Sequence, residues 1–239
     1  MNNSIRLDSH LARLGIASRR NIARVLQEKT VAINGKRVTE PGIRVDPKTD
    51  HISLNGKSIT KPPLVYFLVY KPKGYISSAA DENGRKQVTD LVTTPYRIYP
   101  VGRLDKESHG IMLLTNDGEL SNLLTHPRYH IPKAYEVLIH GKVADHKLLK
   151  LRSGVKLADG MTLPAEVKVL RQTHSKTLLQ IVLYEGKKRQ IRRMCEALEL
   201  PLMDLKRVKF GPLSLGKLQP GNYRAVTKVE IRLLKQIKQ

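Results

Sequence analysis

The segment Tyr99-Pro100-Val101-Gly102-Arg103-Leu104-Asp105-Lys106-Glu107-Ser108-His109-Gly110 is the most informative part of this 239-residue sequence. Two glycines bracket a polar stretch, and the apolar run Ile111-Met112-Leu113-Leu114-Thr115 follows directly. This pattern predicts a tight loop that leads into a buried β-strand. Asp105 stands among cations, where a carboxylate stays ionised and can act as a nucleophile or a base. A lone Asp is, however, more often a turn residue or half of a surface ion pair.

Strands are also predicted on both sides of this loop, with a few helices between them. β-branched and aromatic residues favour strands at 65–70, 134–139, 165–170 and 178–183. Helical patterns fall at 119–124, 145–151, 190–198 and 229–237. This mixture indicates an α+β domain built on a mixed, largely antiparallel sheet.

The amino-terminal stretch has a pattern of its own. Leucines at helical spacing from residue 7 predict a first helix, and Ser18 is placed to cap a second one over 19–29. An Asn34-Gly35 pair between two short apolar runs predicts a β-hairpin. A polar segment that ends in two prolines follows. We therefore expect a small domain at 4–56, a linker at 57–64 and a larger domain at 65–239.

The charge of the chain favours a polyanionic partner. There are 43 Lys and Arg against 21 Asp and Glu, which gives a formal net charge of +22. Nucleic acid is the leading candidate, and an acidic membrane surface or solubility alone are the alternatives. The basic residues are spread over the chain and form no single amphipathic stripe, which argues against a membrane surface.

Several classes of protein are disfavoured. The sequence has no apolar run long enough for a membrane span and no apolar stretch typical of a secretory signal at its start. Cys195 is the single cysteine, so an internal disulfide is excluded, and a reduced, cytoplasmic protein is expected. Neither a glycine-rich phosphate loop nor a nucleophile elbow is present. His126 and His130 approach metal-ligand spacing, but Pro127 disfavours a helix there, so we expect no metal and no cofactor.

The segment 185–198 predicts a helix with two distinct faces. Ile191, Met194, Cys195 and Leu198 follow helical spacing and should be buried. The opposite face carries three arginines, which are Arg189, Arg192 and Arg193. Such a helix can bind phosphate or pair with a carboxylate from elsewhere in the chain. By spacing alone, solvated charge explains these arginines equally well.

Basic residues of the amino-terminal unit gather on one predicted helix and one hairpin. They are Arg19, Arg20 and Arg24 on the helix, with Lys36 and Arg37 near the hairpin tip. Such a surface can bind the phosphate backbone of a folded RNA, or it can simply be solvated. The runs Ile5-Arg6-Leu7-Asp8, Leu14-Gly15-Ile16-Ala17-Ser18-Arg19-Arg20 and Val31-Ala32-Ile33-Asn34-Gly35-Lys36-Arg37-Val38 resemble the αL-type RNA-binding domain of ribosomal small-subunit protein four. The resemblance favours RNA binding.

Ordered motifs occur along most of the remaining chain. They include Tyr70-Lys71-Pro72-Lys73-Gly74, Gly102-Arg103-Leu104-Asp105, Leu113-Leu114-Thr115-Asn116-Asp117-Gly118, Lys133-Ala134-Tyr135, Arg189-Gln190-Ile191-Arg192-Arg193-Met194 and Arg207-Val208-Lys209-Phe210-Gly211-Pro212-Leu213. Together they resemble the RsuA/RluB/RluF branch of the ribosomal RNA pseudouridine synthases. One departure is Ser108, because the family usually has Thr there. The hydroxyl is retained, so we expect its hydrogen bond to survive.

The resemblance implies a site and a substrate. Asp105 would be the catalytic carboxylate, Arg192 its ionic partner and Tyr135 the platform for a flipped base. Arg103, Lys133 and Arg189 would bind the substrate, with no cofactor and no metal. The substrate would be ribosomal RNA, with the large subunit or a pre-ribosomal particle favoured, and a monomer is the default. The alternative is a non-catalytic RNA-binding ribosome-assembly factor, but such a factor has no need of that catalytic trio.

Overall fold

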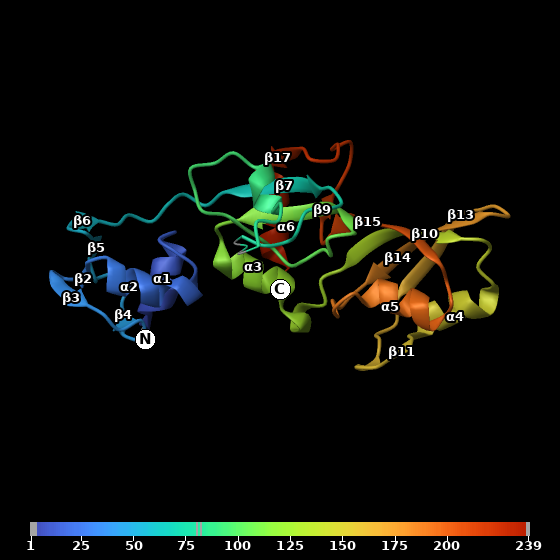
Figure 1. The fold of residues 1–239 in the computed structure, drawn as a ribbon, viewed down its shortest axis with the longest axis horizontal. Coiled ribbons are helices and arrows are strands. Elements are labelled where there is room, and N and C mark those ends of the chain that lie inside the picture. Colours follow the sequence, from blue (N-terminus) through green and yellow to red (C-terminus); the bar gives the residue numbers. More distant parts are fainter. Residues whose placement is uncertain (1–3, 80, 82, 238–239) are drawn as a thin grey trace. The chain divides into compact units, whose positions relative to one another are not determined.

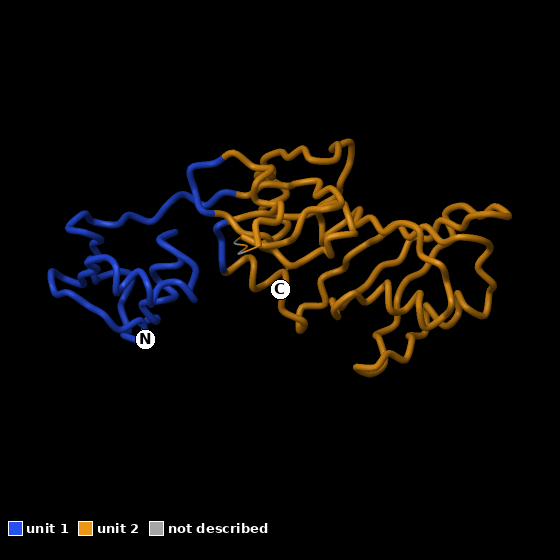
Figure 2. Tube along the Cα trace, viewed as in Figure 1, with its two compact units in different colours: residues 1–65, 94–97, 116–118 blue, residues 66–93, 98–115, 119–239 orange. Residues whose placement is uncertain are grey.

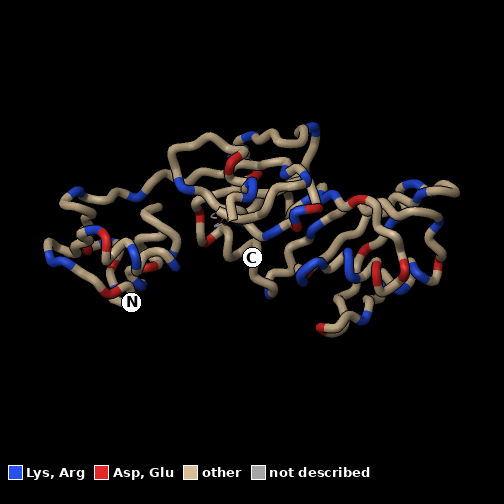
Figure 3. Tube along the Cα trace, viewed as in Figure 1, with Lys and Arg blue, Asp and Glu red and all other residues tan. Residues whose placement is uncertain are grey.

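The computed structural model describes residues 4–79, 81 and 83–237 (Figure 1). The chain forms two compact units (Figure 2). Unit 1 contains the described residues up to 65, together with 94–97 and 116–118, and unit 2 contains the rest. Lys and Arg occur along the trace of both units, in keeping with the net charge of +22 (Figure 3).

Unit 1 packs two short helices and a small sheet around an apolar core. The helices are α1 (Leu7–Arg13) and α2 (Ile22–Glu28), and a 3₁₀ turn at Arg19–Asn21 precedes α2. The sheet has the order β3-β2-β5-β6, from β2 (Val31–Ile33), β3 (Lys36–Val38), β5 (Ile52–Leu54) and β6 (Lys57–Ser58). A separate ribbon pairs β1 (Ile5–Arg6) with β4 (Arg44–Val45). Leu7, Leu11, Ile22 and Leu26 are completely buried between these elements.

Local signals explain how unit 1 is built. The Ser18 hydroxyl accepts a hydrogen bond from the Asn21 amide (3.3 Å), as a capping residue does, but the chain first makes the 3₁₀ turn and becomes α-helical at Ile22. Asn34 and Gly35 have φ angles of 49° and 81°, the combination that a tight hairpin turn requires. Residues 57–58, which the sequence predicts to be linker, pair with β5 as strand β6.

Unit 2 is built on a sheet with the order β13-β14-β10-β15-β9-β7-β17. Its strands are β7 (Tyr66–Lys71), β9 (His109–Thr115), β10 (Lys133–His140), β13 (Glu166–Gln172), β14 (Lys176–Leu183), β15 (Leu202–Phe210) and β17 (Tyr223–Ala225). β15 and β9 run parallel, whereas the other neighbours along this path are antiparallel. The prediction of an α+β fold with a mixed, largely antiparallel sheet is confirmed.

Helices and short strands complete unit 2. The helices are α3 (Gly118–Thr125), α4 (Asp145–Ser153), α5 (Gln190–Ala197) and α6 (Lys228–Gln236), with 3₁₀ turns at Val88–Leu91 and Pro127–Tyr129. The short strands are β8 (Tyr99–Pro100), β16 (Leu213–Ser214) and the β11–β12 hairpin (Lys156–Leu157 and Gly160–Met161). Within the described residues, no helix is both long and apolar enough to cross a membrane.

Two apolar clusters hold the helices against the sheet. The first cluster contains Leu148 of α4, Met194 of α5 and Val137 of β10. Helices α4 and α5 lie beside strands β10 and β14 (Figure 1). In the second, Leu123 of α3 and Leu234 of α6 pack with strands β7 and β9. The buried face of α5 consists of Ile191, Met194 and Cys195, as the helical spacing predicts. The arginines of α5 therefore lie on its opposite, more exposed side.

Gly110 allows strand β9 to approach strand β15 very closely. Its φ angle is 115°, and a Cβ atom built on it would lie 2.2 Å from the carbonyl oxygen of Arg207. The obstacle is backbone and cannot swing away like a side chain. The close approach brings the end of the Asp105 loop next to β15.

We predict that Gly110→Ala lowers the free energy of unfolding by about 2–3 kcal/mol, because the methyl group must push two paired strands apart. Chemical denaturation of both proteins measures this difference. Gly84→Ala serves as the control, because no atom of the described residues beyond its chain neighbours lies within 4 Å of the added Cβ, and only the backbone conformation (φ 65°) is strained. Equal destabilisation by the two substitutions would show that the strand contact at Gly110 is unimportant.

Candidate active site

A cleft of about 620 Å³ opens in unit 2 beside the Asp105 loop. It is lined by that loop, by the start of β10, by the end of β15 and by the turn that leads into α5. Five predicted site residues line it, namely Arg103, Asp105, Lys133, Tyr135 and Arg189. The sixth, Arg192, contacts Asp105 directly. The structure thus brings together residues that are separated by up to 89 positions in the sequence.

Backbone contacts fix the Asp105 loop on both sides of its carboxylate. Ser77 makes a reciprocal pair with Leu104, because its hydroxyl donates to the Leu104 carbonyl (2.7 Å) and accepts from the Leu104 amide (2.9 Å). The Lys106 carbonyl accepts from the Gly74 amide (2.9 Å). The Ser108 amide donates to the Asp105 carbonyl (3.0 Å), which closes a turn. The position of Asp105 is therefore set by its neighbours on each side.

Arg192 connects helix α5 to this loop. Its Nε lies 3.7 Å from Oδ2 of Asp105, and the two side chains are 20% and 32% exposed. Its Nη2 donates to the Ser108 hydroxyl (3.0 Å) and to the Glu107 carbonyl (3.1 Å). The guanidinium thus holds the loop by hydrogen bonds and faces the carboxylate as an opposite charge. The Ser108 hydroxyl makes the hydrogen bond that the sequence predicts for it.

Lys71 lies completely buried beneath the loop. Its ammonium donates to the carbonyls of Ser108 (2.6 Å), Pro72 (3.0 Å) and Lys106 (3.5 Å). Burial lowers the pKa of Lys71 to about 8, although the negative charges of Asp105 and Glu107 act to raise it. Lys71 therefore anchors the loop from below and adds a buried positive charge near Asp105.

We predict a pH signature for Lys71. Because its folded pKa lies below the ordinary 10.5, the unfolded chain binds more protons between pH 8 and 10.5. The free energy of unfolding should therefore gain a rising contribution with pH across that window. Denaturation of Lys71→Met over this range should show a smaller slope, whereas the control Lys168→Met, at an exposed lysine of β13, should keep the wild-type slope. Identical slopes in all three proteins would contradict a buried, titrating Lys71.

The lining of the cleft also contains an aromatic ring and a buried arginine. Tyr135 on β10 is half-buried, and its direct partner across the sheet is Arg207 on β15. Arg207 is 2% exposed, donates from Nε to the Ile111 carbonyl (2.9 Å) and lies over the Phe210 ring, 5.0 Å from its centroid. Within the described part of the chain, its buried Nη2 has no hydrogen-bond partner. Arg207 therefore retains a donor beside the cleft.

Lys133 adds a half-buried ammonium to the lining of the cleft. It donates to the Ile131 carbonyl (2.8 Å). Burial and, to a lesser extent, the charge of Arg207 lower the pKa of Lys133 to about 8, although Glu185 acts to raise it. Basic residues thus outnumber the two carboxylates that line the cleft, Asp105 and Glu185, and this charge suits an anionic substrate.

A polar chain anchors the end of the loop. The Tyr70 hydroxyl lies 2.8 Å from Nδ1 of His109, and Nε2 of His109 lies 2.8 Å from Oδ2 of Asp204. Lys73 pairs with the other oxygen of Asp204 at 2.5 Å. Because His109 directly follows Ser108, this chain fixes the junction between the loop and β9.

Comparison with known proteins decides the family. A family model described as RNA pseudouridylate synthase matches residues 65–197, and a model of the S4 domain matches residues 5–51. The ribosomal large subunit pseudouridine synthase B of Bacillus subtilis is 42% identical over 235 residues, which cover 97% of this chain and 96% of that protein. The chain belongs to the RNA pseudouridine synthase family.

Two further comparisons agree with this family. An uncharacterized RNA pseudouridine synthase of Aquifex aeolicus is 36% identical over 232 residues, which cover 96% of this chain and 93% of the relative. A crystal structure of a pseudouridylate synthase superposes with a TM-score of 0.70 at 28% identity, covering 96% of this chain and 99% of the other. The synthase fold and an amino-terminal S4 domain are therefore shown, and the protein is an isomerase by family.

The predicted RNA-binding residues of this synthase all lie exposed on unit 1. Arg19 pairs with Asp8 (3.3 Å), and Arg24 pairs with Glu28 one helical turn away (3.3 Å). Arg20 follows Arg19 in the 3₁₀ turn, and Lys36 and Arg37 lie on the hairpin strand β3. Their role in RNA binding stays a prediction.

Three residues that support the synthase site received no role from the sequence, although two of them lie in its motifs. They are Lys71, Ser77 and Arg207. A lysine or arginine inside a strand pattern looks like a solvated position, and a single serine carries no signal. Among the described residues, no group of three or more His, Cys, Asp or Glu side chains is arranged to hold a metal ion.

Proposed function

We propose that this protein isomerises a specific uridine of ribosomal RNA to pseudouridine, with Asp105 as the catalytic carboxylate. One observation carries the proposal: Asp105 is held against Arg192 inside an electropositive cleft of a synthase fold. The large-subunit RNA is the favoured substrate, because the Bacillus relative at 42% identity is named for that subunit.

The reaction needs one well-placed carboxylate. The bond between N1 of uracil and C1′ of the ribose breaks, the base turns, and C5 bonds to C1′. The C5 proton leaves and N1 gains a proton, so the overall change is an isomerisation that consumes no co-reactant. Asp105 can begin it by attack on C1′ or C6 or by removal of the 2′ proton.

The surrounding residues receive complementary roles. Arg192 positions Asp105, because its positive charge lies 3.7 Å from the carboxylate and its hydrogen bonds fix the loop. The uridine must first leave its base stack, which costs a few kcal/mol. Tyr135 then stacks on the uracil while it is detached from the ribose. Three cations that line the cleft bind the phosphates and the base, namely Arg103, Lys133 and Arg189.

The amino-terminal unit supplies affinity for the folded RNA. We propose that residues 4–56 form the RNA-binding domain and residues 65–239 the catalytic domain. We further propose that the protein acts as a monomer in the cytoplasm. The positive charge of both parts supports this division, since sequence-independent affinity for RNA comes largely from phosphate contacts.

Mapping of pseudouridine tests the proposal. Unmodified large-subunit and small-subunit ribosomal RNA are incubated separately with the protein, and new pseudouridines are located by chemical modification and primer extension. We expect one site, or a few neighbouring sites, in the large-subunit RNA. Modification of the small-subunit RNA alone would overturn the subunit assignment. Tight binding with no modification of either RNA would instead indicate a non-catalytic ribosome-assembly factor.

A further inference from the structure

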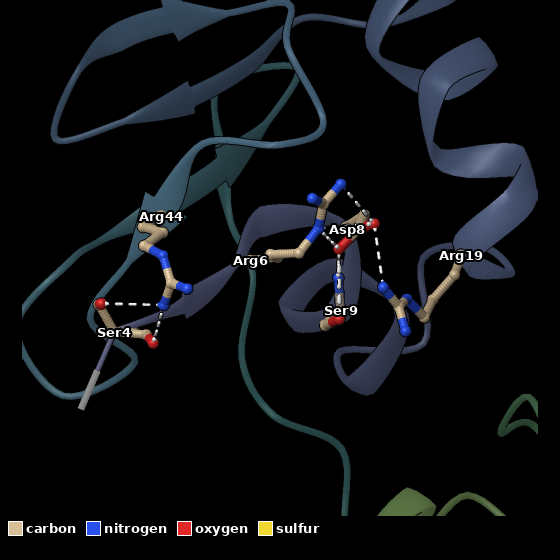
Figure 4. Close-up of polar contacts among 6 residues, drawn as sticks. All are labelled: Ser4, Arg6, Asp8, Ser9, Arg19 and Arg44. Atoms are coloured by element: carbon tan, nitrogen blue, oxygen red, sulfur yellow. Dashed lines mark hydrogen bonds and ion pairs between the residues drawn. The ribbon is translucent and has the colours of Figure 1, made fainter.

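A nearly buried carboxylate joins two exposed arginines on unit 1. Asp8, in the first turn of α1, has a side chain that is 11% exposed, whereas Arg6 and Arg19 are 52% and 60% exposed. Figure 4 shows the two guanidiniums reaching the carboxylate from different elements, β1 and the 3₁₀ turn at Arg19–Asn21. Arg6 and Arg19 are 13 positions apart, so the carboxylate is what brings them together.

Both carboxylate oxygens of Asp8 accept hydrogen bonds, as expected for the ionised form. Nε of Arg6 donates to both oxygens at 3.3 Å, and Nη2 of Arg19 donates to Oδ2 at 3.3 Å. The Ser9 amide donates to Oδ1 at 2.5 Å. Burial raises the pKa of Asp8, but the hydrogen bonds from the two arginines and Ser9 together hold it below its ordinary value.

The cluster retains positive charge and free donors. Arg6 lies directly opposite Arg44 in the β1–β4 ribbon, and like charges in such positions repel. Arg44 donates to the Ser4 carbonyl (3.1 Å) and has no carboxylate partner within the described residues. Nε and Nη1 of Arg19 also have no partner in the described part of the chain. The two arginines around Asp8 therefore keep positive charge and donors that can bind another anion.

We propose that Arg6 and Arg19 form a clamp for a phosphodiester group of the folded RNA substrate and that Asp8 is its positioning residue. This inference rests on the proposed function, because it names how the RNA is held by unit 1. Guanidiniums bind phosphate through paired N–H donors, and a fixed pair loses less conformational freedom on binding than two mobile side chains. Arg6 is therefore added to the residues that contact RNA. Asp8, although negatively charged, favours RNA binding because it holds both arginines in place.

The direction in which Asp8→Asn changes the affinity for RNA distinguishes this clamp from a general effect of charge. If Asp8 were only a negative charge near the RNA, Asp8→Asn would tighten binding, because the substitution removes repulsion. If Asp8 positions the clamp, the same substitution weakens binding even though the protein becomes more positive. We expect affinity for a large-subunit ribosomal RNA fragment to fall roughly 5- to 10-fold, with a salt dependence shallower by about one phosphate contact.

Glu28→Gln is the matched control. Glu28 is also a carboxylate of unit 1 paired with one arginine, but it is exposed and holds Arg24 within a single helix. This control should bind the RNA fragment as tightly as the wild type or more tightly. Fluorescence anisotropy with the full chain over a series of salt concentrations measures all three proteins. Equal or tighter binding by Asp8→Asn overturns the proposal.

A further variant distinguishes positioning from damage to the fold. In the Arg6→Gln/Arg19→Gln background there is no clamp to organise, so adding Asp8→Asn should leave the affinity unchanged. A loss there as large as in the wild type would show that Asp8 acts through folding, and the clamp would be wrong. Because binding is measured without turnover, a protein that binds RNA through the clamp but forms no pseudouridine would refute only the proposed reaction.

Discussion

Asp105→Asn should abolish isomerisation and leave the affinity for ribosomal RNA nearly unchanged. We expect the single-turnover rate of pseudouridine formation to fall by roughly 10⁴-fold, at the upper end of what one positioned acid or base contributes. The amide has almost the same shape as the carboxylate but can neither attack carbon nor accept a proton. The loop itself should persist, because Ser77, Gly74 and Lys71 hold its backbone.

Glu107→Gln is the control for this experiment. Glu107 is an exposed carboxylate two residues away in the same loop, and only its backbone carbonyl contacts Arg192. Its substitution also removes one negative charge, but the rate should stay within a few fold of the wild type. If Asp105→Asn reacted about as fast as Glu107→Gln, Asp105 would not be the catalytic carboxylate.

Arg192→Gln should produce the second-largest loss, about 10²- to 10³-fold in kcat at saturating RNA. The substitution removes the opposite charge 3.7 Å from Asp105 and also weakens the hold on Ser108 and Glu107. Arg192→Lys should recover only part of the rate, because a single ammonium cannot replace the planar guanidinium at both places. Single-turnover kinetics, with the dissociation constant measured in parallel, separates this effect from binding.

Arg193→Gln controls for the loss of positive charge from the same helix. Arg193 pairs with Asp159 (2.8 Å). Its substitution should leave kcat nearly unchanged, whatever it does to affinity. If the two glutamine variants had equal kcat values, Arg192 would be one more surface cation and would not position Asp105.

The sequence predicts those parts of the fold in which side-chain periodicity matches burial. Helix α5 is the clearest case, because Ile191, Met194 and Cys195 follow helical spacing and are buried. The same holds for β14, where apolar residues alternate between core and partly exposed positions. The Asp105 loop is predictable from its glycines and its charge.

Other features cannot be predicted from the sequence, because the side chains buried there are charged. Strand β15 lies in the middle of the sheet, yet its sequence Leu-Met-Asp-Leu-Lys-Arg-Val-Lys-Phe contains four charged residues, and one of them, Arg207, points into the core. Lys71 is likewise a fully buried cation whose partners are backbone carbonyls, which no side-chain pattern reveals. Buried charges depend on contacts from distant segments, so only the folded chain shows them.

Unit 1 shows the same limit on a smaller scale. The sequence places Arg19 and Arg24 on a polar face, and both are exposed. Their partners differ in kind, because Glu28 lies one turn away on the same helix, whereas Asp8 comes from another element and also binds Arg6. Sequence spacing predicts the first pair, since residues four apart on a helix are neighbours. It does not predict the second.

Release of the C5 proton tests the central claim most directly, because that proton must leave when C5 bonds to C1′. Large-subunit ribosomal RNA carrying tritium at C5 of its uridines is incubated with the protein, and the tritium that passes into water is counted. We predict release equivalent to one or a few uridines per RNA molecule with the wild type and none above background with Asp105→Asn. No release by the wild type, or equal release by both proteins, would contradict the account.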